Sequence, residues 1–161
     1  MLGMTAPTPQ PNVVISSSQH AVRVPRADIR RLVSFLAEEE EAAIAEVDLA
    51  VVPAGEMAAM NRRYLRHAGA TDVLSFDMSD DTRRGLAVQL VVCGEVAAKE
   101  AAARGLPVRH ELLLYVVHGL LHVMGYEDQS VRGAAKMHAR EEELLAAFLR
   151  RGRTPKATPR R

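Results

Sequence analysis

The segment from His118 to Asp128, HGLLHVMGYED, places the strongest local constraint on how this chain can fold. His118 and His122 are four residues apart. On a helix, side chains at this spacing lie one turn above each other, with Cβ atoms roughly 5–6 Å apart. Gly125 supplies the left-handed backbone conformation that ends many helices, so the chain can turn back toward the histidines. The segment therefore predicts a helix that presents two imidazoles and stops in a tight turn.

The same spacing predicts a metal site in which Asp128 is the third ligand. Neutral imidazole and carboxylate are good ligands for zinc, and a catalytic zinc has three protein ligands and an activated water in the fourth position. Glu127 and His138 compete for the role of third ligand. Asp128 is favoured because it lies six residues beyond His122, just past the turn. The alternative is that His118 and His122 are core histidines whose nitrogens are satisfied by the backbone.

The residue at position 119 helps to indicate which class of reaction a zinc site here could catalyse. Zinc proteases of the HExxH type carry a glutamate there as general base, and this chain has Gly119. A peptidase is therefore disfavoured. A zinc ion could still supply a Lewis acid and an activated water for a substrate that needs no strong protein base.

Length and composition exclude several other classes. A chain of 161 residues fits one domain, and Cys93, its only cysteine, excludes a disulfide framework or a cysteine-ligated zinc cluster. No stretch approaches the ~18 uninterrupted apolar residues of a membrane span, so we expect a cytoplasmic protein without a membrane partner. The net charge is only +1, and basic residues gather at 62–66 and 150–161. Aromatic residues are few, so base-stacking platforms and strong sequence specificity are not expected.

Hydrophobic periodicity predicts an α+β fold. We expect a single domain over 12–150, with a disordered leader at 1–11 and a basic disordered tail at 151–161. The element order is β-α-β-α-β-β-α-α-α: about four strands in a mixed sheet and about five helices, with the zinc site on a central helix. Adjacent third and fourth strands suggest a hairpin. The expected strands are 13–17, 47–52, 71–77 and 86–93, the last of them central, and the other helices are 25–40, 56–64, 95–104 and 131–149.

The histidine segment resembles the YbeY family pattern HGxLHLxGYDH. The first nine positions match except for Val123, a conservative change. The resemblance continues in Asn61, in Tyr64 and in the run TDVLSF at 71–76. It also includes Gly94-Glu95, Met137 and Glu141.

The resemblance implies a zinc-dependent, single-strand-specific endoribonuclease that takes part in 16S rRNA 3′-end processing and ribosome quality control. One Zn²⁺ ion is implied, held by His118, His122 and Asp128, although the family has a histidine at the last position. Implied partners are single-stranded RNA or rRNA and the ribosome or small-subunit assembly factors, with no nucleotide cofactor.

The family has an arginine where this chain has Leu65. Arg66 is then the candidate catalytic arginine, and Arg62 and Arg63 are candidates for substrate binding, because a guanidinium stabilises the negative charge of a phosphodiester transition state. The alternative for these arginines is a solvated helix face. The alternative for the whole protein is a ribosome-assembly binding protein with a structural metal and little or no nuclease activity.

Overall fold

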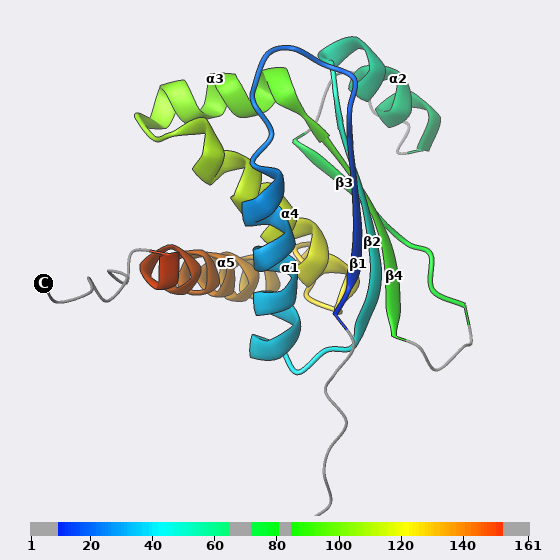
Figure 1. Cartoon of the computed structure of the whole chain (residues 1–161), viewed down its shortest axis with the longest axis vertical. Helices are drawn as coiled ribbons and strands as arrows, with labels where there is room; N and C mark the ends of the chain where they lie inside the picture. Colours follow the sequence, from blue (N-terminus) through cyan, green and yellow to red (C-terminus); the bar gives the residue numbers. More distant parts are fainter. Residues whose placement is uncertain (1–9, 65–71, 81–84, 153–161) are drawn as a thin grey trace, which may run out of the picture.

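The computed structural model describes residues 10–64, 72–80 and 85–152, and its elements follow the predicted order (Figure 1). The domain is α+β, as expected. The strands are β1 (Asn12–Ser17), β2 (Ile44–Val52), β3 (Val73–Asp77) and β4 (Leu86–Cys93). The helices are α1 (Arg26–Glu39), α2 (Ala54–Tyr64), α3 (Gly94–Arg104), α4 (Val108–Val123) and α5 (Val131–Gly152).

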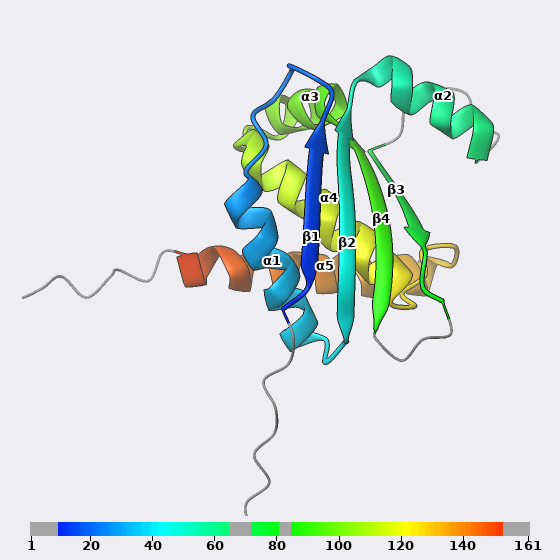
Figure 2. The ribbon, with the colours of Figure 1, turned by 45° about the vertical axis from the view of Figure 1, so that its right-hand side comes forward.

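The four strands form one mixed sheet in the order β1-β2-β4-β3 (Figure 2). β1, β2 and β4 are parallel, and β3 is antiparallel to β4. The predicted pairing of the third and fourth strands is thus confirmed. So is the central place of β4, whose nearly continuous apolar sequence suits a strand that is covered on both faces.

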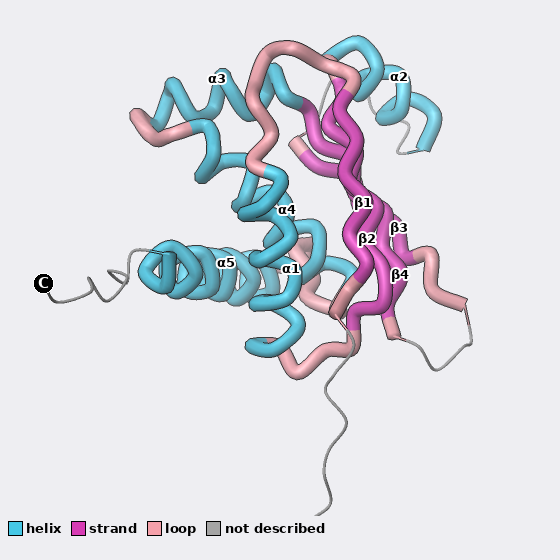
Figure 3. The backbone as a smooth tube through the Cα atoms, viewed as in Figure 1, coloured by secondary structure: helices cyan, strands magenta, loops and turns pink. Residues whose placement is uncertain are grey.

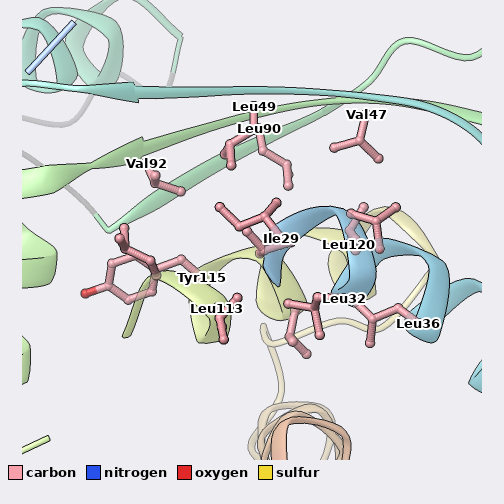
Figure 4. Packing of buried hydrophobic residues seen from close by; sticks show 14 of the residues in the cluster. Ile29, Leu32, Leu36, Val47, Leu49, Leu90, Val92, Leu113, Tyr115 and Leu120 are labelled. Carbon is pink, nitrogen blue, oxygen red and sulfur yellow. The ribbon is translucent and has the colours of Figure 1, made fainter. Parts of the chain in front are cut away.

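The helices cover the two faces of the sheet unequally (Figures 1 and 3). α1 and α4 lie against one face, α5 packs on both of them, and α2 lies on the opposite face near the carboxyl ends of the parallel strands. Strand side chains alternate between the faces. In the larger core, strand residues meet helix residues across this interface (Figure 4): Val47, Leu49, Leu90 and Val92 face Ile29, Leu32, Leu36, Leu113, Tyr115 and Leu120.

β2 begins three residues earlier than predicted. Its register with β4 shifts between Ile44 and Glu46, as at a β-bulge. Ile44 and Val47 consequently join the same core even though an odd number of positions separates them. Strict alternation cannot include both residues, which is why the sequence pattern alone placed the start at Val47.

Gly94 and Glu95 join β4 to α3 and also fix neighbouring segments. A Cβ atom at Gly94 would lie 2.4 Å from Oε1 of Gln19, so a larger residue there would displace the buried Gln19 side chain. The carboxylate of Glu95 accepts a hydrogen bond of 3.0 Å from the backbone N–H of Ala54, the first residue of α2. An acid at this position also complements the positive end of the α2 dipole.

Parts of the predicted organisation lie outside the described residues. These are positions 1–9 of the expected leader, Thr71 of the expected third strand and positions 153–161 of the expected tail. Arg151 and Gly152 complete α5, which continues three residues past the expected end at Leu149. Within the described residues no helix combines the length and apolar character needed to cross a membrane.

Candidate functional site

Both histidines lie in the C-terminal half of α4, as predicted. His122 is exposed and His118 is partly exposed, whereas Val117, Leu120 and Leu121 beside them are buried. The imidazoles therefore lie where a largely buried helix reaches solvent, on positions that a shared ligand could contact from one side.

Gly119 is required for the packing of this helix against the sheet. A Cβ atom there would lie 2.6 Å from Cδ2 of Leu90 on β4 and 3.4 Å from Cγ2 of Val73 on β3. Position 119 thus faces the sheet, and the interface has no room for a glutamate. The absence of the protease general base, noted in the sequence, has a packing reason.

A buried carboxylate holds the first histidine. Oε1 of Glu141 on α5 is in hydrogen-bond contact with Nδ1 of His118 on α4, and Glu141 is only 5% exposed. This hydrogen bond raises the pKa of His118 above its ordinary value, against the opposing effect of burial. Because Nδ1 is engaged, Nε2 is the ring nitrogen that could bind a metal. Carboxylates commonly orient metal-binding histidines in this way.

The turn after α4 has the geometry predicted from Gly125. This glycine has φ of +107°, and its N–H donates to the carbonyl of His122 (3.2 Å). The N–H of Tyr126 donates to the carbonyl of Leu121 (3.1 Å). The pair of bonds is a Schellman motif, which satisfies the last carbonyls of the helix and reverses the chain. Exposed Asp128 follows two residues after Tyr126.

A polar network anchors this turn to the rest of the domain. The Tyr126 hydroxyl donates to the carboxylate of Glu40, with O–O distances of 3.2 and 3.3 Å. Nε of Arg140 on α5 donates to the same carboxylate at 2.8 Å. Glu40 caps the end of α1, so three segments far apart in the sequence meet at one acid. Sequence reasoning did not identify Glu40 or Arg140, because neither has a local pattern that points to Tyr126.

The start of α5 closes the other end of the turn. Oγ of Ser130 accepts a hydrogen bond of 2.9 Å from the N–H of Gly133 and donates to Glu127 at 3.1 Å. A Cβ atom at Gly133 would lie 2.6 Å from the carbonyl oxygen of Glu127. The segment that carries Asp128 is therefore held at both ends.

The donor chemistry of His118, His122 and Asp128 fits zinc, but their side chains do not form a ready-made cage. Over residues 10–64, 72–80 and 85–152, no three His, Cys, Asp or Glu side chains are grouped so that they could hold a metal ion. Asp128 is nevertheless within electrostatic range of the first histidine, since its charge and that of Asp72 also raise the pKa of His118. The role of Asp128 as third ligand stays a prediction.

The candidate arginines are not brought to the histidines within the described residues. Arg62 and Arg63 are exposed near the end of α2, on the opposite face of the sheet from α4. The guanidinium of Arg63 lies 5.4 Å from the ring centroid of Tyr64, and that ring packs edge-on against Phe76 of β3 at 5.4 Å. Arg66 lies outside the described residues.

Glu111, two turns before His118, is buried at 2% exposure and takes a structural role. Its Oε1 accepts a hydrogen bond of 2.9 Å from Arg104 of α3. Nearby, Tyr115 is also buried, and burial together with the negative charge of Glu111 raises the pKa of its hydroxyl above the ordinary range. Glu111 and Arg104 thus join α3 to the start of α4.

Fold and site together define a mixed α+β domain whose central helix presents a histidine pair backed by a buried carboxylate. The family model described as Endoribonuclease YbeY matches residues 14–149. This chain belongs to the YbeY family, as the motifs in the sequence predicted.

Individual relatives agree with that assignment. A protein from Renibacterium salmoninarum named Endoribonuclease YbeY is 34% identical over 146 residues, covering 84% of this chain and 92% of the relative. Another of that name, from Macrococcus caseolyticus, is 35% identical over 131 residues, covering 75% and 84%. A solution structure from Thermotoga maritima matches with a TM-score of 0.55 and 22% identity, over 92% of this chain and 99% of the other. The last similarity supports the fold alone.

Proposed function

We propose that this protein is a zinc-dependent endoribonuclease that cleaves single-stranded RNA in rRNA maturation, including 16S rRNA 3′-end processing, and in ribosome quality control. Its membership of the YbeY family and the name that its relatives carry support RNA as the substrate. The ribosome or small-subunit assembly factors would then be its partners in the cytoplasm.

The observation that carries the proposal is the contact between buried Glu141 and Nδ1 of His118. A carboxylate taken out of water is costly unless it is paired and hydrogen-bonded, and the imidazole of His118 supplies that pairing for Glu141. The contact fixes the ring orientation and leaves Nε2 available. His118, His122 and Asp128 would hold one zinc ion. When bound, zinc supplies a Lewis acid and lowers the pKa of water at an open coordination position.

The residues of the chain have separable roles in this proposal. Glu141 orients His118, and the anchored turn after α4 limits the positions that Asp128 can adopt. Arg66 would stabilise charge on the phosphodiester, and Arg62 and Arg63 would bind the substrate backbone, because guanidinium groups pair with phosphate oxygens. The closed packing at Gly119 leaves the task of a general base to a group other than residue 119.

The primary test is metal content followed by RNA cleavage. Purified protein should contain about one zinc per chain, as a three-ligand catalytic site predicts. It should cleave single-stranded RNA, lose activity with a chelator, and be inactive as His118→Ala. Activity that is equal in all samples would refute the proposal. Bound metal without cleavage would favour the alternative, a ribosome-assembly binding protein with a structural metal.

A paired substitution tests the third ligand. Asp128→Ala should weaken zinc binding by at least about tenfold, because removing a ligand should cost no less than removing a residue that only orients a ligand. Asp128→His should retain one zinc, because imidazole is an equally suitable donor. Glu127→Ala is the matched control for loss of a neighbouring acid. If Glu127→Ala weakens binding and Asp128→Ala does not, the ligand is Glu127.

A further inference from the structure

Six arginines line two neighbouring hollows along α1, although the chain as a whole is close to neutral. One hollow, of about 970 Å³, lies at the start of α1 and runs to the start of α4. The second, of about 520 Å³, lies between α1 and α5. Among the residues that the structure describes, Asp28 and Glu38 are the only acids that line them. The arginines are Arg23, Arg26 and Arg109 in the first hollow and Arg30, Arg31 and Arg151 in the second. We call this set the arginine surface.

Two of these arginines also protect the edge of the sheet. β1 is an edge strand, and edge carbonyls tend to recruit other chains. Arg26 donates to the carbonyl of Ile15 at 2.8 Å, and Arg30 donates to the carbonyl of Val13 at 2.6 Å. Each of these contacts uses one of the several N–H groups of a guanidinium, so both side chains are held in place with donors remaining.

Three other members are held against aromatic rings or an acid. The guanidinium of Arg31 lies 5.5 Å from the ring centroid of Phe148, and that of Arg151 lies 5.3 Å from the centroid of Phe35. Arg31 and Arg109 both pair with Asp28, with Nε of Arg109 at 2.5 Å. Guanidinium groups stacked in this way are pre-organised and still carry charge toward solvent.

Helix stability does not account for all of these charges. Arg26 lies in the first turn of α1, and Glu38 and Glu39 lie in the last. The helix dipole favours acids at the start and bases at the end, an arrangement that Asp28 in the first turn follows and these three residues do not. Arg26 and Arg30 serve contacts with β1, whereas Arg31 also pairs with Asp28 within the helix. Edge protection explains Arg26 and Arg30, and the dipole of α5 favours Arg151 in its last turn, but neither accounts for Arg23 or Arg109.

We propose that the arginine surface binds the phosphodiester backbone of single-stranded RNA, away from the point of cleavage. The inference rests on the proposed function for its RNA substrate. Phosphate contacts dominate the affinity of proteins for nucleic acids, and arginine is the residue best suited to phosphate oxygens. Phe35 and Phe148 are each only 5% exposed, so their rings support the arginines and do not stack on bases. Binding is consequently independent of sequence.

The arginine surface and the histidines lie on different parts of the domain. α1 runs along the β1 side of the sheet, whereas Gly119, next to His118, packs against β3 and β4 (Figure 2). A short RNA bound at the histidines would not reach the arginine surface, and a long one would. The arginine surface therefore favours long RNA over short RNA and does not distinguish between bases.

The test compares two charge-matched double variants in binding to a fluorescein-labelled single-stranded RNA, with chelator present to prevent cleavage. Arg23→Gln/Arg151→Gln neutralises one arginine in each hollow. Lys99→Gln/Arg132→Gln neutralises two exposed cations elsewhere. The first variant should bind about tenfold more weakly, and the slope of log K against log salt should become shallower by about 1.4, as two lost phosphate contacts predict. Equal binding by both variants would overturn the proposal.

A variant with one negative charge fewer provides a second test if the Arg23→Gln/Arg151→Gln protein misfolds. Asp28→Asn removes an acid from the arginine surface and should bind RNA about twofold more tightly. Unchanged or weaker binding by a folded Asp28→Asn protein would contradict the proposal. Loss of binding to phosphatidylserine vesicles by Arg23→Gln/Arg151→Gln, with RNA binding intact, would overturn it in favour of a lipid surface.

The same proteins separate this inference from the proposed function. The Arg23→Gln/Arg151→Gln protein should cleave a short oligonucleotide at the wild-type rate. Its KM for a long RNA should be higher than that of the wild-type protein. If the wild-type protein cleaves no RNA but the variant still loses RNA binding, the arginine surface stands and the nuclease assignment fails. If cleavage is normal and the variant binds long RNA normally, only the arginine surface fails.

Discussion

The carboxylate of Glu141 contacts Nδ1 of His118 across the interface between α5 and α4. The two residues are 23 positions apart, and the acid is buried while the imidazole reaches solvent. The contact sets which nitrogen of the histidine faces outward. Of the changes at this site, replacing Glu141 has the clearest expected effect on metal binding.

Replacing Glu141 with Gln should weaken zinc binding by about 10–100-fold, the usual effect of losing the partner of a metal-binding histidine. The amide is nearly isosteric but lacks the charge that fixes the imidazole. A competition titration with a chromophoric chelator measures the affinity. Glu142→Gln, on the exposed side of α5, is the control. Equal affinities for wild type and Glu141→Gln would mean that the contact does not serve the metal.

The network at Glu40 should hold the turn that carries Asp128. Tyr126→Phe removes the hydroxyl that donates to Glu40 and keeps the ring, so unfolding should require about 1 kcal/mol less free energy. Amide hydrogen exchange over 124–130 should become faster. Tyr64→Phe, at a half-exposed tyrosine on α2, should change neither quantity. Exchange in the turn that is unaffected by Tyr126→Phe would show that other contacts hold it.

Asp28 should make stability depend on pH under acidic conditions. Its hydrogen bond to Arg109 lowers the pKa of the Asp28 carboxyl below its ordinary value of 3.8, and Arg31 acts in the same direction. A lowered pKa in the folded state means that the stabilising contribution is present above the unfolded pKa and is lost as the pH falls through the folded pKa. Urea unfolding at a series of pH values should therefore show a smaller acid-induced loss of stability for Asp28→Asn than for wild type. Asp48→Asn, at an exposed position of the interior strand β2, is the comparison. A profile identical to wild type for Asp28→Asn would contradict the assignment.

The close packing of α4 on the sheet predicts that two glycine substitutions have opposite effects on the folding free energy. Gly119→Ala places a Cβ atom 2.6 Å from the Leu90 side chain, which should cost about 1–3 kcal/mol of folding free energy. Gly55→Ala in α2 meets no atom within 4 Å, and it should be neutral or stabilise by up to about 1 kcal/mol. Denaturant titrations compare the two. A Gly119→Ala protein as stable as wild type would show that Leu90 can move aside.

Much of the fold could be predicted from local patterns. The apolar run of β4 indicated a central strand, and the spacing of His118 and His122 indicated a helix whose end Gly125 then determined. These features depend on residues a few positions apart, where backbone geometry links sequence to structure directly. The start of β2 was missed because a register shift at Ile44 interrupts the alternation on which the prediction relied.

The sequence by itself determined the order of the elements, the histidine pair and the turn that follows it, because each depends on short-range spacing and on the conformational preference of glycine. Only the tertiary structure decided that Glu141 holds His118, that Glu40 anchors Tyr126 and that position 119 has no room for an acid. It also gathered the arginines of α1, α4 and α5 on one surface. These contacts join residues that are distant in the sequence. The residues come together because the helices pack on the sheet and on one another, and no local sequence pattern encodes that packing.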